Sequence, residues 1–240
     1  SEKESLPTEK RPFPAPMNNM KEIPKIKYII TLDFDTNLIL NSAFELIGTM
    51  EHILNKPILK DGVVIEGHGI IQPKVGIDLK EAEKSWFSRI FAGSAGTDLY
   101  TNAISDFYQD NFDEGIFTGK GIYELNTFYN VMKYAIPEYT VLSHDLLEGS
   151  YLRCGLATDV LLMDGYPSKF MSFTTRQNRW IRGDWQICNW LCKYIQNEKK
   201  ERIRNPINKL SKYKIFDNLR RSLISLFELI LLAIGIYTHK

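Results

Sequence analysis

A run of apolar and β-branched residues between positions 26 and 32 ends abruptly in the acidic triplet Asp33-Phe34-Asp35. Its length and composition are typical of a buried β-strand. Behind it, Ser42 and Glu45 have the spacing of a capping box, and apolar residues then recur at helical intervals, at Ala43, Ile47, Met50 and Leu54. The order of strand, acidic loop and helix favours folds in which helices connect the strands of a sheet.

The following part of the chain alternates in the same way. A second strand is expected at residues 63–71, with a bend at Gly67-His68-Gly69 and an end at Pro73. Further elements are expected as strands at residues 115–124 and 158–163, and as helices at residues 81–91, 127–134, 145–153 and about 175–196. Strands that alternate with helices predict an α/β fold whose sheet is covered on both faces.

Composition narrows the classes of function. The 240 residues are enough for one or two domains with a sizeable core, and 44% apolar and 25% charged residues are ordinary for a soluble domain. Because 30 basic and 29 acidic residues give a formal net charge of +1, the chain lacks the positive field of a non-specific nucleic-acid binder. Three cysteines are too few for a disulfide scaffold and suit a reducing compartment.

The two ends of the chain differ from its middle. Residues 1–25 are rich in proline, lysine and glutamate, which predicts a flexible linker and no signal peptide. Residues 201–240 begin with basic residues interleaved with apolar ones, which predicts an interfacial amphipathic helix. The apolar run at residues 223–237 is shorter than the ~20 residues that cross a bilayer, and the basic cluster before it predicts the start of a membrane helix. A buried C-terminal helix is the alternative.

Asp33 and Asp35 are the strongest chemical signal in the sequence. Alternate residues at the end of a strand project to the same side, and α/β sheets bind ligands at the carboxyl ends of their strands. Two carboxylates there suit Mg²⁺ or Mn²⁺, with other coordination positions left for water and substrate phosphates. A solvated turn has the same pattern. Haloacid-dehalogenase phosphatases are a weaker alternative, because their Asp-x-Asp-x-Thr motif would need a threonine one residue after Thr36.

Three other motifs have open interpretations. Residues 115–121 have the glycines and lysine of a phosphate-binding loop, but the glycine spacing is one residue short, so we exclude a nucleoside triphosphatase and expect a flexible turn. Ser143-His144-Asp145 either caps a helix or supplies Asp145 as a single general base, since three consecutive residues cannot form a triad. Residues 176–180, with Arg176, Arg179 and Trp180, either pack on the core or hold a diphosphate and a sugar.

Taken in order, these motifs resemble those of the processive inverting glycosyltransferases of the GT-A fold, which include cellulose and chitin synthases. That family has Asp-x-Asp, then an acidic Thr-Glu-Asp-like motif, then Gln-x-x-Arg-Trp, and here Arg176 replaces the usual glutamine. More specifically, the chain looks like the glycosyltransferase domain of bacterial cyclic β-1,2-glucan synthases at residues 28–33, 117–123, 141–149 and 179–186. The likeness covers roughly residues 26–222.

The resemblance implies a GT-A-like mixed sheet flanked by helices and an enzyme that transfers glucose from UDP-glucose to a growing β-1,2-glucan with inversion. It implies that Asp33 and Asp35 hold Mg²⁺ or Mn²⁺ at the leaving diphosphate, and that Asp145 is the general base for the acceptor hydroxyl. It also implies a set of substrate-binding residues, which are Thr118, Gly119, Lys120, His144, Arg176, Arg179 and Trp180.

The resemblance also predicts how the chain is organised. A linker at residues 1–25 would precede a partial catalytic domain at residues 26–200 and a membrane-associated segment at residues 201–240. Residues 1–32 lack the upstream aspartate with which the family contacts the nucleotide, so we expect a fragment that depends on other domains of the same polypeptide. The expected location is the cytoplasmic face of the bacterial inner membrane, with UDP-glucose, glucan and membrane lipid as partners and no nucleic acid. A non-catalytic, membrane-anchored scaffold is the alternative.

Overall fold

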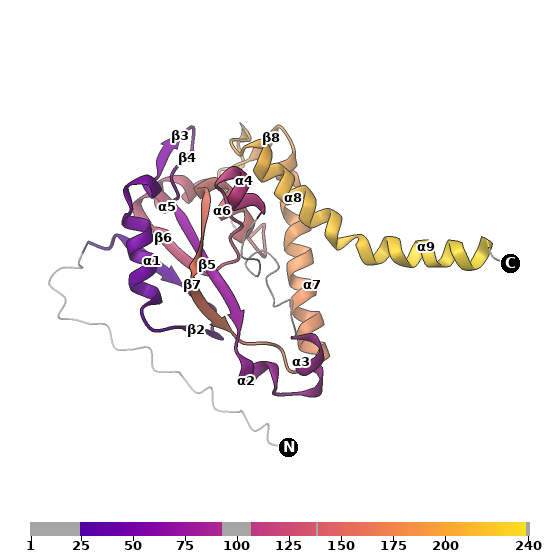
Figure 1. Cartoon of the computed structure of the whole chain (residues 1–240). Helices are drawn as coiled ribbons and strands as arrows, with labels where there is room; N and C mark the ends of the chain where they lie inside the picture. The colour runs from indigo at the N-terminus through magenta and orange to yellow at the C-terminus, as the bar shows by residue number, and fades with distance from the viewer. Residues whose placement is uncertain (1–24, 93–106, 138, 239–240) are drawn as a thin grey trace, which may run out of the picture.

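The computed structural model describes residues 25–92, 107–137 and 139–238, and the predicted linker lies outside them except for residue 25. The main sheet of this described part has five strands in the order β1-β6-β5-β7-β2 (Figure 1). Its central pair, β5 and β7, is parallel, and the other pairs are antiparallel, so the sheet is mixed. The strands are β1 (Tyr28–Thr31), β2 (Thr36–Leu38), β5 (Ile70–Ile77), β6 (Gly121–Glu124) and β7 (Cys154–Asp164).

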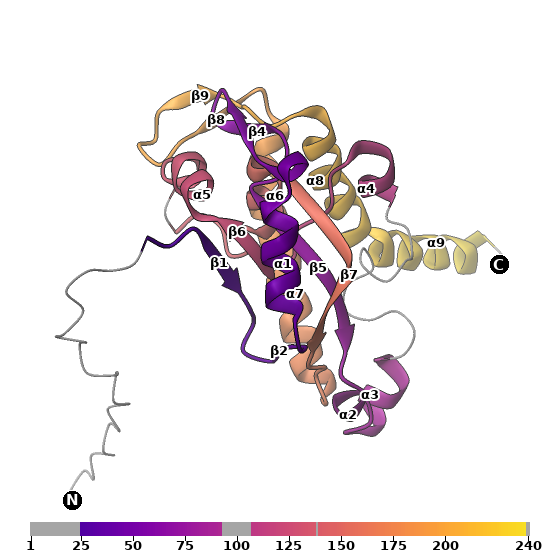
Figure 2. The same ribbon diagram turned by 60° about the vertical axis from the view of Figure 1, so that its left-hand side comes forward.

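Helices lie on both faces of this sheet, as the alternating sequence pattern predicted (Figure 2). On one face, α1 (Ser42–Glu51) contacts β5, β6 and β7. The other face carries α5 (Leu125–Met132), α6 (Asp145–Leu152), α7 (Phe170–Gln186) and α8 (Lys209–Ser222). The expectation of an α/β fold with a mixed sheet flanked by helices is therefore confirmed.

Side chains of the central strands contribute to two separate hydrophobic cores, one on each face of the sheet. Ile71 and Ile122 pack with Leu46 and Met50 under α1, whereas Ile70 points into the larger core on the opposite face. Neighbouring residues of a strand point to opposite faces, so one apolar strand contributes to both cores. This explains why neighbouring residues such as Ile70 and Ile71 are both apolar.

The N-terminus of α1 differs from the prediction. The helix is there, but Asn41 is its N-cap, in a left-handed conformation and without a side-chain capping bond. Ser42 donates instead to the carbonyl oxygen of Leu161 at 3.0 Å, which ties α1 to β7. The buried face consists of Ser42, Leu46 and Met50, and Leu54 lies beyond the end of the helix, 78% exposed.

The predicted strand at residues 63–71 divides in two. β4 (Val63–Glu66) forms a hairpin with β3 (Ile58–Lys60), and β5 begins after Gly69 and continues through Pro73, where we expected an end. Proline lacks the N–H that a sheet ladder needs, and the pairing of β5 with β7 shifts register between Pro73 and Lys74. The shift accommodates the proline and lets the strand run on.

Other predicted elements have different lengths. The helix expected at residues 81–91 is two short helices, and the strand expected at residues 115–124 is strand only in β6. The helix expected at residues 175–196 begins earlier and ends at Gln186, before a short 3-10 helix and a hairpin. The remaining elements are η1 (Ile53–Asn55), α2 (Leu79–Ala82), α3 (Trp86–Phe91), α4 (Phe107–Phe112), η2 (Ile187–Leu191), β8 (Tyr194–Gln196) and β9 (Arg202–Arg204).

The C-terminal part begins with α8, which packs on α7 and η2. Lys214 of α8 is buried, and its Nζ lies 3.1 Å from Oε2 of the buried Glu114 and donates to the carbonyl oxygen of Gly115 at 2.9 Å. One face of this basic helix therefore belongs to the protein interior.

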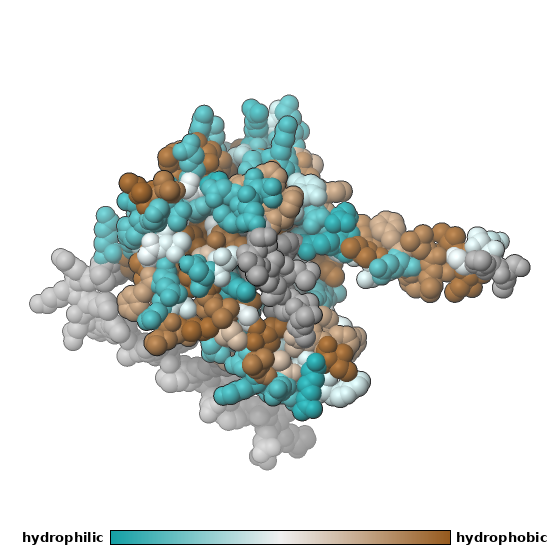
Figure 3. Space-filling model, viewed as in Figure 1, coloured by the Kyte–Doolittle hydropathy of each residue, from teal (hydrophilic) through white to brown (hydrophobic). Residues whose placement is uncertain are grey.

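The final helix, α9 (Ile224–Thr238), projects away from the sheet and has no buried residue (Figures 1 and 3). It has 15 residues, and among the described helices we find none whose length and apolar character would allow it to cross a membrane. The structure therefore does not support the expected C-terminal membrane helix.

Candidate active site

All ten residues singled out from the sequence line one cleft of about 730 Å³. The turn between β1 and β2 supplies Asp33 and Asp35, and the loop before β6 supplies residues 118–120. The start of α6 supplies His144 and Asp145, and α7 supplies Arg176, Arg179 and Trp180. Four segments that are distant in the sequence therefore meet at one end of the sheet.

Both acidic side chains of the first motif are exposed to this cleft. The turn is closed by the N–H of Thr36, which donates to the carbonyl oxygen of Asp33 at 3.0 Å. Asp35 accepts from the N–H of Gly165 through its own carbonyl oxygen at 3.0 Å. A Cβ atom on Gly165 would lie 3.0 Å from the Asp35 carboxylate, so glycine lets the chain pass close to this group.

Lys120 forms ion pairs with two acidic side chains of the cleft. Its Nζ lies 2.9 Å from Oδ2 of Asp33 and 3.0 Å from Oδ2 of Asp164, and Thr36 also donates to Asp164. Burial alone would lower the pKa of Lys120, but the charges of Asp164 and Asp33 raise it above the ordinary value. The buried lysine therefore remains an ammonium ion at neutral pH.

The acidic pair fits a divalent cation. Lys120 engages Oδ2 of Asp33, and both Asp33 and Asp35 are exposed and line the cleft. Hard carboxylate oxygens with room for water and phosphate oxygens are what Mg²⁺ and Mn²⁺ need. Asp33 and Asp35 are thus the residues that would hold the cation.

Asp145 is the first residue of α6 and lies against the glycine of the neighbouring loop. Gly119 has a φ of +92°, and a Cβ atom there would lie 3.2 Å from Oδ2 of Asp145. Burial, followed by the charge of Glu148, raises the pKa of Asp145. A carboxylate with a raised pKa is a stronger base, which is the property that proton abstraction requires.

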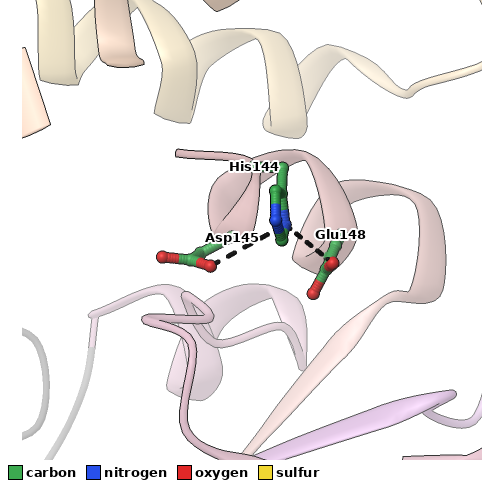
Figure 4. Close-up of side chains that lie close together, drawn as sticks. All are labelled: His144, Asp145 and Glu148. Carbon is green, nitrogen blue, oxygen red and sulfur yellow. Dashed lines mark ion pairs between the residues drawn. The ribbon is translucent and has the colours of Figure 1, made fainter. Parts of the chain in front are cut away.

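The side chains of His144, Asp145 and Glu148 form a cluster at the start of α6 (Figure 4). Nδ1 of His144 lies 2.8 Å from Oε1 of Glu148 and 4.0 Å from Oδ1 of Asp145. Ligand atoms of the three residues all lie within 4.8 Å of one another, the one such group among the described residues. Glu148 was not predicted from the sequence.

The segment from Arg176 to Trp180 on α7 also lines the cleft. The Arg176 guanidinium lies 5.1 Å from the ring centroid of Trp180 and 5.9 Å from that of Tyr166, so it is held between two aromatic faces. Its Nε and Nη2 atoms are buried and make no hydrogen bond within the described part of the chain. Such a guanidinium is able to pair with a phosphate group or a sugar hydroxyl.

Sequence reasoning missed several residues that shape the cleft. Asp164 is the last residue of β7, much as Asp33 follows the end of β1. An aspartate at the end of a predicted strand is a sequence signal from which Asp164 could have been found. No sequence signal pointed to Gln72, which is buried in β5. Its Oε1 accepts hydrogen bonds from the N–H of Thr118 at 3.0 Å and from the hydroxyl of Thr118 at 3.1 Å. On α7, a Cβ atom at Gly183 would lie 2.6 Å from Cβ of Ser143, so this glycine lets α7 pack on the segment before Asp145.

The chain is similar in sequence to a region of a glucan synthase. It is 42% identical over 215 residues, or 88% of its length, to the cyclic beta-(1,2)-glucan synthase NdvB of Rhizobium meliloti (strain 1021). The chain spans about 7% of the length of that relative. No protein-family model matches the chain.

Proposed function

We propose that this chain forms the transfer site of an inverting, metal-assisted glucosyltransferase that uses UDP-glucose to extend a β-1,2-glucan. The observation that carries the proposal is the meeting of three motifs in one cleft: the acidic pair, Asp145, and the Arg176 to Trp180 segment. Similarity to a cyclic glucan synthase over 88% of the chain supports the same substrate class.

In the proposed reaction, the acceptor hydroxyl oxygen bonds to the anomeric carbon of glucose while the bond from that carbon to the diphosphate oxygen breaks. Asp145 accepts the hydroxyl proton, and its raised pKa supports this role. Arg179 and Arg176 contribute positive charge toward the leaving diphosphate, and Trp180 stacks on the acceptor sugar. A Mg²⁺ or Mn²⁺ ion held by Asp33 and Asp35 would offset the negative charge of that diphosphate.

The loop before β6 borders the acceptor side in this proposal. Gln72 fixes Thr118, Lys120 anchors the loop to two carboxylates, and Gly119 lies against Asp145. The loop thus sets the distance between the acidic pair and the base. His144 lies at the edge of the same region and is 54% exposed.

Donor binding is the first test. In isothermal titration of the chain with UDP-glucose, we expect binding that requires Mn²⁺ and that disappears on chelation with EDTA. Asp33→Asn combined with Asp35→Asn should weaken binding at least about tenfold, since carboxylates hold the cation. Asp61→Asn, in an exposed turn between β3 and β4, is the matched control.

The alternative is a non-catalytic scaffold, which is favoured by the small share of the relative that the chain spans. A scaffold would show no donor binding that depends on the metal. That result, in a chain that is folded by circular dichroism, would refute the transferase proposal. The phosphatase alternative gains no support, because the matched relative is a glucan synthase.

We also propose a location at the cytoplasmic face of the inner membrane, with α9 lying on the lipid surface. The exposed side chains of this helix are almost all apolar, as Figure 3 shows, and the last turn of α8 before it carries Arg220 and Arg221. Other domains of the same polypeptide would add contacts to the uridine, whereas the metal-dependent contacts to the diphosphate belong to this chain.

Vesicle binding tests this location. The chain should sediment with vesicles of phosphatidylglycerol and phosphatidylethanolamine, and Leu229→Glu combined with Leu232→Glu should reduce the bound fraction about tenfold or more, because each buried leucine contributes about 2 kcal/mol. Leu40→Glu, at a leucine beyond β2 that is more exposed than either, is the control. Equal sedimentation of both variants would contradict the role of α9.

A further inference from the structure

A buried glutamate, Glu148, lies about one helical turn after the proposed base, Asp145, on α6. Glu148 of α6 is 6% exposed, and both of its carboxylate oxygens have partners. Oε2 accepts a hydrogen bond from the hydroxyl of Tyr123 at 2.7 Å, and Oε1 lies 2.8 Å from Nδ1 of His144. A carboxylate held at both oxygens has one orientation, so Glu148 is a fixed negative charge.

Tyr123 anchors this arrangement in the core. Its ring, on β6, makes edge-to-face contacts with Phe117 at 5.5 Å and Phe128 at 4.9 Å between ring centroids. Burial, together with the charge of Glu148, raises the pKa of Tyr123 well above its ordinary value. The phenol therefore remains protonated and continues to donate to Glu148.

His144 lies closer to Glu148 than to Asp145 (Figure 4). Its Nδ1 is 2.8 Å from Oε1 of Glu148 but 4.0 Å from Oδ1 of Asp145. A histidine that paired directly with Asp145 would occupy an oxygen that the acceptor hydroxyl needs. Asp145 lines the cleft, and its Oδ2 accepts a hydrogen bond from the hydroxyl of Ser143 at 3.5 Å.

We infer that Glu148 is a positioning residue for Asp145: anchored by Tyr123, it holds His144 aside and places a fixed negative charge behind the base. The inference rests on the proposed transferase function, because it assigns Asp145 the role of base. It adds a residue three positions beyond the Ser143-His144-Asp145 motif, within the resembling segment at residues 141–149.

The electrostatics of the site agree with this geometry. The groups that face Asp145 are Glu148 and His144 on α6, Asp33 after β1 and Lys120 before β6. After burial, Glu148 makes the largest contribution that raises the pKa of Asp145, and His144 and Lys120 act in the opposite direction. The hydrogen bond to Glu148 raises the pKa of His144.

A metal site is the competing explanation for the convergence of His144, Asp145 and Glu148. The hydrogen bonds argue against it, because Tyr123 and His144 already occupy both oxygens of Glu148. A cation bound through Nδ1 of His144 would replace the proton that this nitrogen donates to Glu148.

The test follows titrations in the chain by NMR, with labels on the Asp145 carboxyl and the His144 ring. In Glu148→Gln, both midpoints should move to lower pH, because the negative charge behind Asp145 and the partner of His144 are lost. In His144→Ala, the Asp145 midpoint should move to higher pH, since a nearby positive charge is removed. Two shifts of opposite sign are not expected from a general loosening of the fold.

Glu45→Gln, on the exposed side of α1, is the matched control and should move neither midpoint. If Glu148→Gln fails to fold, Tyr123→Phe replaces it, and the His144 midpoint should then move because Glu148 loses its anchor. Unchanged His144 and Asp145 midpoints in folded variants would overturn the inference. UDP-glucose binding in the presence of Mn²⁺ is measured in parallel, and its absence in every variant would instead count against the proposed function.

Discussion

Asp145→Asn is expected to lower glucose transfer about 10³-fold, since asparagine keeps the shape of the side chain but cannot accept the acceptor's proton. The residue begins α6 and lies against Gly119, so an isosteric amide fits the same space. Incorporation of labelled glucose into β-1,2-glucan, with UDP-glucose, Mn²⁺ and an acceptor oligosaccharide, is the measurement.

Two controls separate loss of the base from other causes. Donor affinity should be unchanged in Asp145→Asn, because Asp33, Asp35 and Lys120 are untouched. Asp159→Asn replaces an exposed aspartate on β7 and should keep full activity. Substantial transfer by Asp145→Asn would remove this residue as the base, even with the donor site intact.

The fold was largely predictable because its signals are local. The strand before Asp33 and the helix after Asp145 each lie within one short periodic run, and both appear where the pattern put them. The face of α1 was not predictable in this way. Ser42 is buried because it bonds to Leu161, far along the chain, and the helix ends before Leu54 can continue the apolar stripe.

The candidate site was predictable as motifs and not as contacts. Three motifs with charged residues were found because the residues of each motif are neighbours in the sequence. The residues that hold them in place come from elsewhere: Thr36 donates to Asp164 across 128 residues, and Gln72 reaches Thr118 across 46. Pairings of this kind arise only when the sheet brings its strands together, so a single sequence gives no spacing from which to infer them.

Lys120→Met is expected to lower the free energy of unfolding by about 3–5 kcal/mol, the cost of leaving a buried charge without its partner. Asp164 is 4% exposed, and among the described residues it would keep only the Thr36 side chain as a donor, whereas Asp33 is exposed and would be solvated. Because the pKa of Lys120 is raised in the folded protein, its contribution is complete at neutral pH. It is lost only as the pH rises above the ordinary lysine value of 10.5.

A double-mutant cycle tests the cause of this loss by urea denaturation at neutral pH. Lys120→Met combined with Asp164→Asn should recover most of the stability, because no unpaired charge then remains buried. Lys60→Met, on the exposed β3, is the control. If the double variant is as unstable as Lys120→Met, packing of the lysine stem, and not its charge, secures the loop that carries Gly119 against the proposed base.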